Sequence, residues 1–209
     1  MLLIAMVLFT LSLTSCDTDS MKPNTSGTVT LHVSFTAKEG KTTRALSGNE
    51  DKVNDITVLV FNSSNDLIGI GYETFTGNTY SMDVTTHVDN NCTVYAIANT
   101  HSSSYFKGIN TIDELNAMNV TQTSAASLGA DSNDIMMSGE QTGVNITTSG
   151  SNLNPIAMAH LCSKINFSIV PKTGSGITVT GYQLCEVPLS SYVTDSHTAV
   201  TASPNGNYG

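Results

Sequence analysis

Apolar and polar positions alternate most regularly over residues 27–37, with the sequence GTVTLHVSFTA. Val29, Leu31, Val33 and Phe35 would project to one side of an extended chain, and polar residues occupy the positions between them. Successive side chains of a β-strand point to opposite faces of a sheet, so this pattern predicts a strand with one buried face.

Two further segments carry apolar residues on both faces. Residues 56–61 (ITVLVF) and 92–98 (CTVYAIA) indicate central strands covered on both sides. Ser63–Asp66 separates the first of them from another apolar run, which predicts a hairpin over residues 53–75. A weaker alternation over residues 79–88 predicts one more strand.

One short helix is predicted after residue 110. Thr111 and Glu114 have the spacing of a capping box, in which a threonine hydroxyl and a glutamate three residues later satisfy the first helical amides. The apolar stripe of this helix would consist of Ile112, Leu115 and Met118.

The C-terminal part again has short strand-like segments. Residues 134–140 and 144–150 indicate short strands or loop edges, and residues 160–171 alternate with Leu161, Ile165, Phe167 and Ile169 pointing inward. Residues 176–193 complete this pattern. Many short strands and a single helix predict an all-β protein, a β-sandwich of about seven strands.

The N-terminus has the character of an export signal. An apolar run from Leu2 to Leu13 is shorter than the roughly 20 residues of a membrane-spanning helix. It ends in Leu13-Thr14-Ser15-Cys16, which fits a bacterial lipobox. We therefore predict signal cleavage between Ser15 and Cys16, lipidation of Cys16, and anchoring to a membrane by more than one acyl chain. The alternative is an ordinary secretory signal peptide.

Arg44 is the only arginine of the chain, and it stands in a polar stretch without apolar periodicity, AKEGKTTRALSGNEDK. Two interpretations are open: Arg44 is a solvated loop residue, or the Arg44–Ala45 bond is the target of an arginine-specific protease. Lys41 would not substitute, because its ammonium is a point charge whereas an arginine-selective pocket reads a planar guanidinium.

Composition narrows the classes of function. A net charge of −9 argues against nucleic-acid binding through a basic surface. No motif of a nucleophile elbow, zinc protease or nucleotide-binding loop occurs, so we predict no catalytic residues, no metal site and no cofactor. The five histidines are scattered, and the cysteines after Cys16 match no zinc motif. Those cysteines are Cys92, Cys162 and Cys185. One disulfide is possible, and packed free thiols are the preferred interpretation.

The lipobox, the arginine in a linker and the ordered segments ITVLVFNSSNDLIG, VYAIANT, IMMSGE, HLCSKINFSIVP and YQLCEVPLSSYV together resemble the fimbrillins of the Bacteroidales. The resemblance implies transthyretin-like Greek-key β-sandwiches. It also implies a structural subunit of fimbriae that is exported to the outer membrane and cell surface as a lipoprotein. An arginine-specific protease would then remove the first strand, Val29 to Phe35, and a strand from another subunit would replace it.

This resemblance divides the chain into four parts. Residues 1–15 would be the lipoprotein signal peptide, and 16–44 the lipidated tether with the removable strand. Residues 45–195 would form the N-terminal sandwich. Residues 196–209 would be a linker or the opening of a second domain, which fimbrillins of about twice this length contain.

Two alternatives remain open. The chain could be a fimbrial anchor or accessory subunit that keeps its lipid. It could also be a glycan-binding adhesin that does not polymerise, with a platform built from tyrosines: Tyr72, Tyr80, Tyr95, Tyr105 and Tyr182. The absence of tryptophan from the sequence argues against such a platform.

Overall fold

The computed structural model describes residues 27–37, 52–77, 80–121, 135–161, 168–181, 183–188, 190–194 and 205–208. The main strands are β1 (Thr28–Ala37), β2 (Asp55–Phe61), β3 (Leu67–Thr74), β4 (Ser81–His87), β5 (Asp89–Ala98), β7 (Met137–Thr147), β8 (Gly150–Ser151) and β9 (Ile156–His160). Helix α1 (Ile112–Asn116) follows β5, and two small pairs join β6 (Asn119–Thr121) with β11 (Ser190–Tyr192) and β10 (Leu184–Pro188) with β12 (Asn205–Tyr208).

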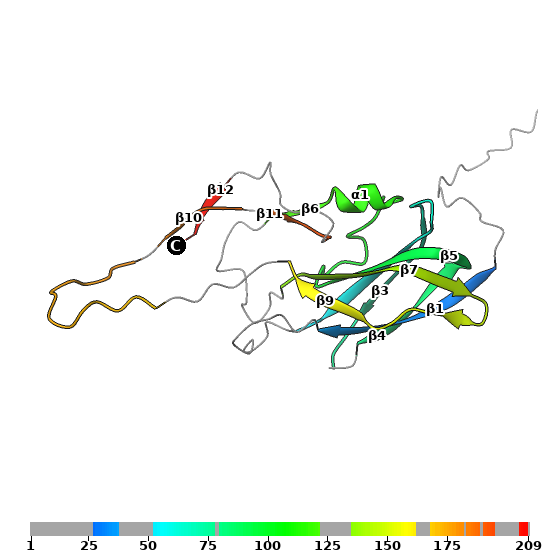
Figure 1. Ribbon diagram of the computed structural model, residues 1–209, viewed down its shortest axis with the longest axis horizontal. Helices are drawn as coiled ribbons and strands as arrows, with labels where there is room; N and C mark the ends of the chain where they lie inside the picture. The colour runs from blue at the N-terminus through cyan, green and yellow to red at the C-terminus, as the bar shows by residue number, and fades with distance from the viewer. Residues whose placement is uncertain are drawn as a thin grey trace, which may run out of the picture.

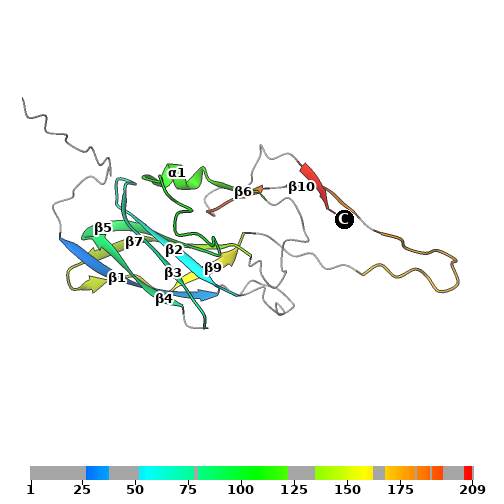
Figure 2. The same ribbon diagram turned by 180° about the vertical axis from the view of Figure 1, so that it is seen from behind.

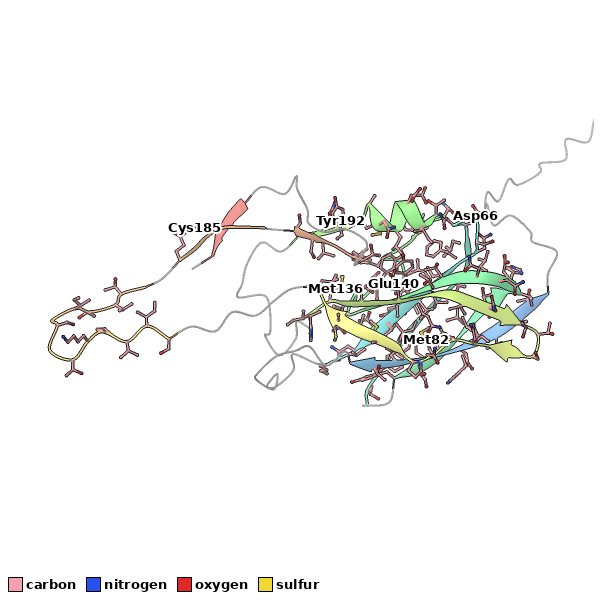
Figure 3. All side chains as sticks on the ribbon, in the orientation of Figure 1. Asp66, Met82, Met136, Glu140, Cys185 and Tyr192 are labelled. Atoms are coloured by element: carbon pink, nitrogen blue, oxygen red, sulfur yellow. The ribbon has the colours of Figure 1, made fainter. Side chains whose placement is uncertain are left out.

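The main strands are hydrogen-bonded in the order β3-β2-β5-β7-β9-β1-β4, with β8 on β7. This path folds over on itself, so that β9, β1 and β4 form one layer against β3, β2, β5 and β7 (Figures 1 and 2). Apolar side chains from all seven strands meet between the layers in one cluster, and Met82 of β4 lies there (Figure 3). The prediction of an all-β sandwich with one short helix is confirmed.

Strands β2 and β5 are buried on both faces, as their composition predicts. All seven residues of β2 are buried. Val58 and Val60 face the interior of the sandwich, whereas Leu59 and Phe61 face a second cluster. That second cluster contains Leu115 of α1 together with other residues from outside the sandwich. Helix α1 therefore covers the outer face of the central strands.

The local signals of the hairpin and the helix are borne out in detail. In the β2–β3 turn, the Asn62 side-chain oxygen accepts from the amides of Ser64 and Asp66, and Asn65 adopts a left-handed φ of 67°. Asparagine tolerates this conformation better than most residues. At α1, Thr111 and Glu114 form the predicted capping box.

Two expectations for the C-terminal part are wrong in the described residues, and Ile165 and Phe167 of the strand predicted over residues 160–171 lie outside them. The two short elements predicted over residues 134–150 are one long strand, β7. Residues 168–181 form no strand, and Ile169, predicted to point inward, is 52% exposed. This segment extends away from the sandwich (Figure 1). Alternating apolar and polar residues show that a segment is suited to the surface of a sheet. A strand forms only if the segment also pairs with a free edge of that sheet.

Gly139 permits the close approach of β7 and β9 that joins the two layers. A Cβ atom at this position would lie 2.5 Å from the carbonyl oxygen of Ala157 and 2.8 Å from a methyl group of Ile156. We expect Gly139→Ala to lower the free energy of unfolding by about 1–3 kcal/mol, measured by urea denaturation, because β9 must move. Gly77→Ala is the control, since nothing lies within 4 Å of its Cβ. Equal stability of the two variants would contradict this account.

Candidate functional site

Strand β1 lies in the middle of its layer, between β4 and β9. It pairs antiparallel with β4 over seven residues, from Thr28 opposite His87 to Ser34 opposite Ser81. Its C-terminal end pairs in parallel with β9, where Phe35 lies opposite Ile156. The first strand of the sequence is therefore an internal strand of the sheet, hydrogen-bonded on both sides.

The inward side chains of β1 are part of the main core. Leu31, Val33 and Phe35 are 2%, 0% and 7% exposed, and Val29 is partly buried against the same cluster. Burial of each such side chain stabilises the fold by roughly 1.5–3 kcal/mol. The predicted alternation of these four residues is thus confirmed, and we call the part of the core that their side chains fill the groove of β1.

Strand β4 depends on β1 for its pairing. Among the described residues, β1 is the only strand in a hydrogen-bonded ladder with β4. The other side of β4 packs against β3, where the hydroxyl of Thr86 donates to the carbonyl oxygen of Ile68 at 3.3 Å. Gly69 allows this approach, because a Cβ there would lie 2.7 Å from the Thr86 side chain. Loss of β1 would leave β4 held mainly by packing against β3.

The outward face of β1 carries a polar contact to β4. Nδ1 of His32 and Oδ1 of Asp83 are 2.7 Å apart, and the two residues lie directly opposite each other in the ladder. Their side chains are 68% and 65% exposed. Solvent therefore screens this pair, and its contribution to stability is small.

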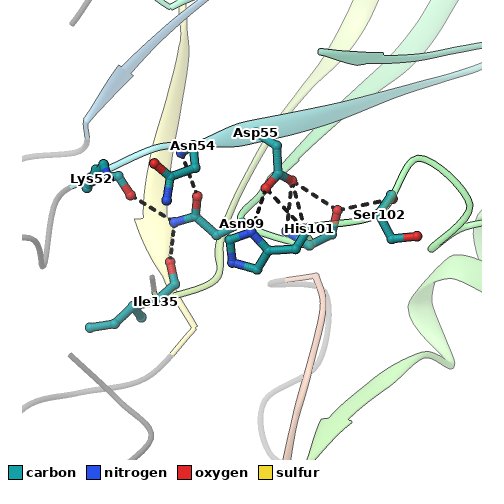
Figure 4. A network of polar contacts seen from close by, with 8 residues as sticks. Lys52, Asn54, Asp55, Asn99, His101, Ser102 and Ile135 are labelled. Carbon is teal, nitrogen blue, oxygen red and sulfur yellow. Dashed lines mark hydrogen bonds and ion pairs between the residues drawn. The ribbon is translucent and has the colours of Figure 1, made fainter. Parts of the chain in front are cut away.

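A polar network binds the segment just ahead of β2, which follows the predicted cleavage site in the sequence (Figure 4). The Asn99 side-chain amide donates to the carbonyl oxygens of Lys52 and Ile135, both at 2.9 Å. Its oxygen accepts from the amide of Asn54 at 2.9 Å. Asn99 has a left-handed φ of 64°, which suits asparagine. This one side chain therefore holds the backbone just ahead of β2 against the segment that leads into β7.

Asp55 is the buried centre of the same network. Its carboxylate is nearly inaccessible and accepts from the backbone amides of Thr100 and His101 and from the Thr100 hydroxyl. The imidazole of His101 lies 3.2 Å from the other carboxylate oxygen. Sequence inspection missed this network, because Asp55 and the residues after Asn99 are far apart in the chain and match no motif.

The remaining predicted site residues fall into two groups. Val29, Leu31, Val33 and Phe35 lie together in the groove. The processing residues Ser15, Cys16, Arg44 and Ala45 lie outside the described residues, so their predicted roles stay predictions.

The cysteines within the described part of the chain form no disulfide. Cys92 is fully buried, and burial, with the charge of Asp89, raises the pKa of its thiol to about 11. This thiol stays protonated and serves as an apolar packing group. Cys185 is exposed on β10, away from the sandwich (Figure 3). Cys162 lies outside the described residues.

Three of the five tyrosines considered for a glycan platform are used in packing, and Tyr182 lies outside the described residues. Tyr95 is buried and contacts Phe61 edge to face, while Tyr80 and Tyr105 pack in the same way on Phe75 and Phe106. Burial, and then a hydrogen bond to Glu140, raises the pKa of Tyr95 above its ordinary value. A hollow beside Tyr95 of about 20 Å³ has room for little more than one water molecule.

The described residues contain neither a membrane-spanning helix nor a metal site. No helix among the described residues is both long and apolar enough to cross a membrane. Within these residues, no group of three or more histidine, cysteine, aspartate or glutamate side chains is placed to hold a metal ion. The groove of β1 is therefore the feature from which a function can be argued.

Solved structures with a related fold come from fimbrial proteins. The chain is similar to a fimbrial assembly protein from Parabacteroides distasonis, with 18% identity and a TM-score of 0.50, over 87% of this chain and 69% of that one. The tip fimbrial protein Mfa3 and a fimbrilin (fimA), both from Porphyromonas gingivalis, give 16% and 14% identity and TM-scores of 0.48 and 0.47. These alignments cover 65% and 63% of this chain but only 49% and 39% of the two relatives.

Sequence comparison gives the family directly. Comparison with curated proteins gives no match. The family model described as major fimbrial subunit protein (FimA) matches residues 25–184, which include β1, the whole sandwich and α1. Since this match covers most of the chain, the protein belongs to the major fimbrial subunit protein (FimA) family.

Proposed function

We propose that this chain is a structural, non-catalytic subunit of cell-surface fimbriae that exchanges β1 for a strand of another subunit. It would be exported as an outer-membrane lipoprotein anchored through Cys16, and an arginine-specific protease would cut it between Arg44 and Ala45. The observation that carries this proposal is the place of β1, whose apolar side chains fill a groove in the middle of a layer.

The order of features along the chain supports this sequence of events. Residues 27–37 lie between the predicted anchor at Cys16 and the lone arginine. A single cut after Arg44 therefore separates the anchor and the strand together from the rest of the chain, residues 45–209, which we call the body. The departure of β1 exposes backbone groups of β4 and β9, which are a template for strand addition. It also uncovers the groove in which Leu31, Val33 and Phe35 were buried.

The two neighbouring strands define the incoming strand. A strand that reproduces the pairing of β1 runs antiparallel to β4 and parallel to β9. It must also present apolar side chains at alternate positions, because only every second residue of a strand faces the groove. A strand shifted by one residue would place its polar side chains in the core.

Asn99 and Asp55 support the part of the proposal that concerns the body. Asn99 binds the backbone at Lys52, and Asp55 begins β2, so both act on the C-terminal side of the cut. A cut after Arg44 leaves this network intact. The body would therefore keep its β2–β3–β5–β7 layer while it exchanges β1.

Proteolysis of the membrane-bound chain tests the proposal. We expect an arginine-specific protease to cut once, displacement of the anchored fragment to release one soluble product, Ala45 to Gly209, and mass spectrometry of the retained fragment to show an acylated N-terminal Cys16. Once the fragment is displaced, the product should melt at a lower temperature and bind more of a dye for apolar surfaces. Addition of a TVTLHVSFTA peptide should reverse both changes.

Arg44→Lys is the matched control, because it keeps the positive charge but removes the guanidinium that the protease recognises. This variant should stay uncut and membrane-bound. The proposal fails if the cut product keeps the full melting temperature after the fragment is displaced and binds no strand peptide. In that event Arg44 is an ordinary loop residue, as the alternative interpretation holds.

A further inference from the structure

We infer that Asp83 selects the strand that occupies the position of β1, by favouring a basic or imidazole side chain at the outward position that His32 holds. The inference rests on the proposed strand exchange and adds a chemical requirement for the partner. Many different strands carry apolar side chains at alternate positions, so this pattern alone would not select one partner. Asp83 would distinguish among them.

The outward face of the β1–β4 ladder contains one carboxylate. Reading along it, the opposite pairs are Thr28 with His87, Thr30 with Thr85, His32 with Asp83, and Ser34 with Ser81. Asp83 is the only acidic residue of β4. Any strand in the groove must therefore place one of its outward side chains directly against a negative charge. Directly opposed like charges destabilise a sheet, whereas opposite charges stabilise it.

The geometry of His32 shows that the contact is made. Nδ1 of His32 lies 2.7 Å from Oδ1 of Asp83, within hydrogen-bond distance. An ionised carboxylate only accepts, so Nδ1 is the atom that carries the proton in this pair. A lysine or arginine at the same position could donate in the same way, but a glutamate could not.

Asp83 also resolves an ambiguity of register. A strand that slips by two residues keeps its apolar side chains in the groove, because the alternation has a period of two. For β1, such a slip would place Thr30 or Ser34 opposite Asp83 in place of His32. The charged pair would be lost. The charged pair thus favours one of several apolar registers.

Charge reversal tests this selection. The full chain is cut after Arg44, and peptides of the β1 sequence compete with its own fragment; the peptides carry His32, His32→Lys, His32→Thr or His32→Glu. For the unsubstituted body, we expect the His32→Glu peptide to bind about fivefold more weakly than the His32→Lys peptide. For an Asp83→Lys body, this preference should reverse. Both preferences should shrink in 1 M salt, where the screening length is about 3 Å.

The His32→Thr peptide is the matched neutral control and should respond little to the Asp83→Lys substitution. Equal affinity of the Lys and Glu peptides for both bodies would overturn the inference and leave strand exchange standing. If no peptide binds either body, including the unsubstituted one, the proposed function and this inference fail together. Reversal without the salt effect would also count against a charge mechanism.

Discussion

Replacement of Val33 by aspartate is expected to release β1 from the groove without any proteolysis. Val33 is fully buried in the main core, where an unpaired carboxylate is strongly unfavourable. We expect the intact chain to lose about 4 kcal/mol or more if β1 stays in place. Part of this loss is avoided if the strand leaves, since β1 is connected to the body only through residues 38–51.

The measurement is binding of a labelled TVTLHVSFTA peptide to the uncut chain. The Val33→Asp variant should bind it and melt at a higher temperature in its presence, whereas the uncut wild-type chain should not bind. Thr36→Asp is the control, because Thr36 is an exposed residue of the same strand and its substitution adds the same charge. An uncut Val33→Asp chain that keeps the wild-type melting temperature would show that β1 contributes little to the core.

Removal of the Asp55 carboxylate should destabilise the body itself. Asp55→Ala removes the acceptor of the backbone amides of Thr100 and His101, whereas the Thr100 hydroxyl keeps the carbonyl oxygen of Ser102 at 3.5 Å. An unsatisfied buried amide costs about 1–3 kcal/mol, and the amide of His101 is only partly buried, so we expect a loss of about 2 kcal/mol in the free energy of unfolding. Urea denaturation measures this loss, and hydrogen exchange should quicken at the two amides.

Asp55→Asn is the matched comparison, because it keeps the shape and one acceptor oxygen while it removes the charge. It should lose less stability than Asp55→Ala. A loss below 0.5 kcal/mol for Asp55→Ala, the range typical of surface substitutions, would show that the network contributes little. The prediction holds equally for the uncut and the cut chain, since the network lies wholly in the body.

Local signals account for the part of the fold that could be predicted from sequence. The alternation of β1, the two-sided apolar strand β2, the turn at Asn62 and the capping box at Thr111 each depend on neighbouring residues alone. Non-local pairing could not be predicted in this way. Nothing in the sequence TVTLHVSFTA indicates that β1 lies between β4 and β9, or that it pairs in parallel with β9.

The errors follow from the same limit. Ile169 and its neighbours have the pattern of a strand, yet pairing with an available edge decides whether a strand forms. Two short elements are predicted over residues 134–150, whereas β7 is continuous there and Gly139 within it admits the close approach of β9. The Asp55 network joins residues from three segments that are far apart in the sequence. Its members become recognisable only once β2 and β5 are side by side.

The position of β1 between β4 and β9 also has a consequence for biogenesis. The β2–β3 hairpin joins residues close in sequence, whereas Phe35 meets Ile156 only after most of the chain has been made. Contacts between residues far apart in sequence form slowly, because the entropy lost in closing a long loop comes before the stabilising contacts form. The first strand to leave a ribosome or an export channel would thus be among the last to reach its place. If β1 docks last, its layer stays open until then at β4 and β9, which is the surface that a strand of a neighbouring subunit is proposed to occupy.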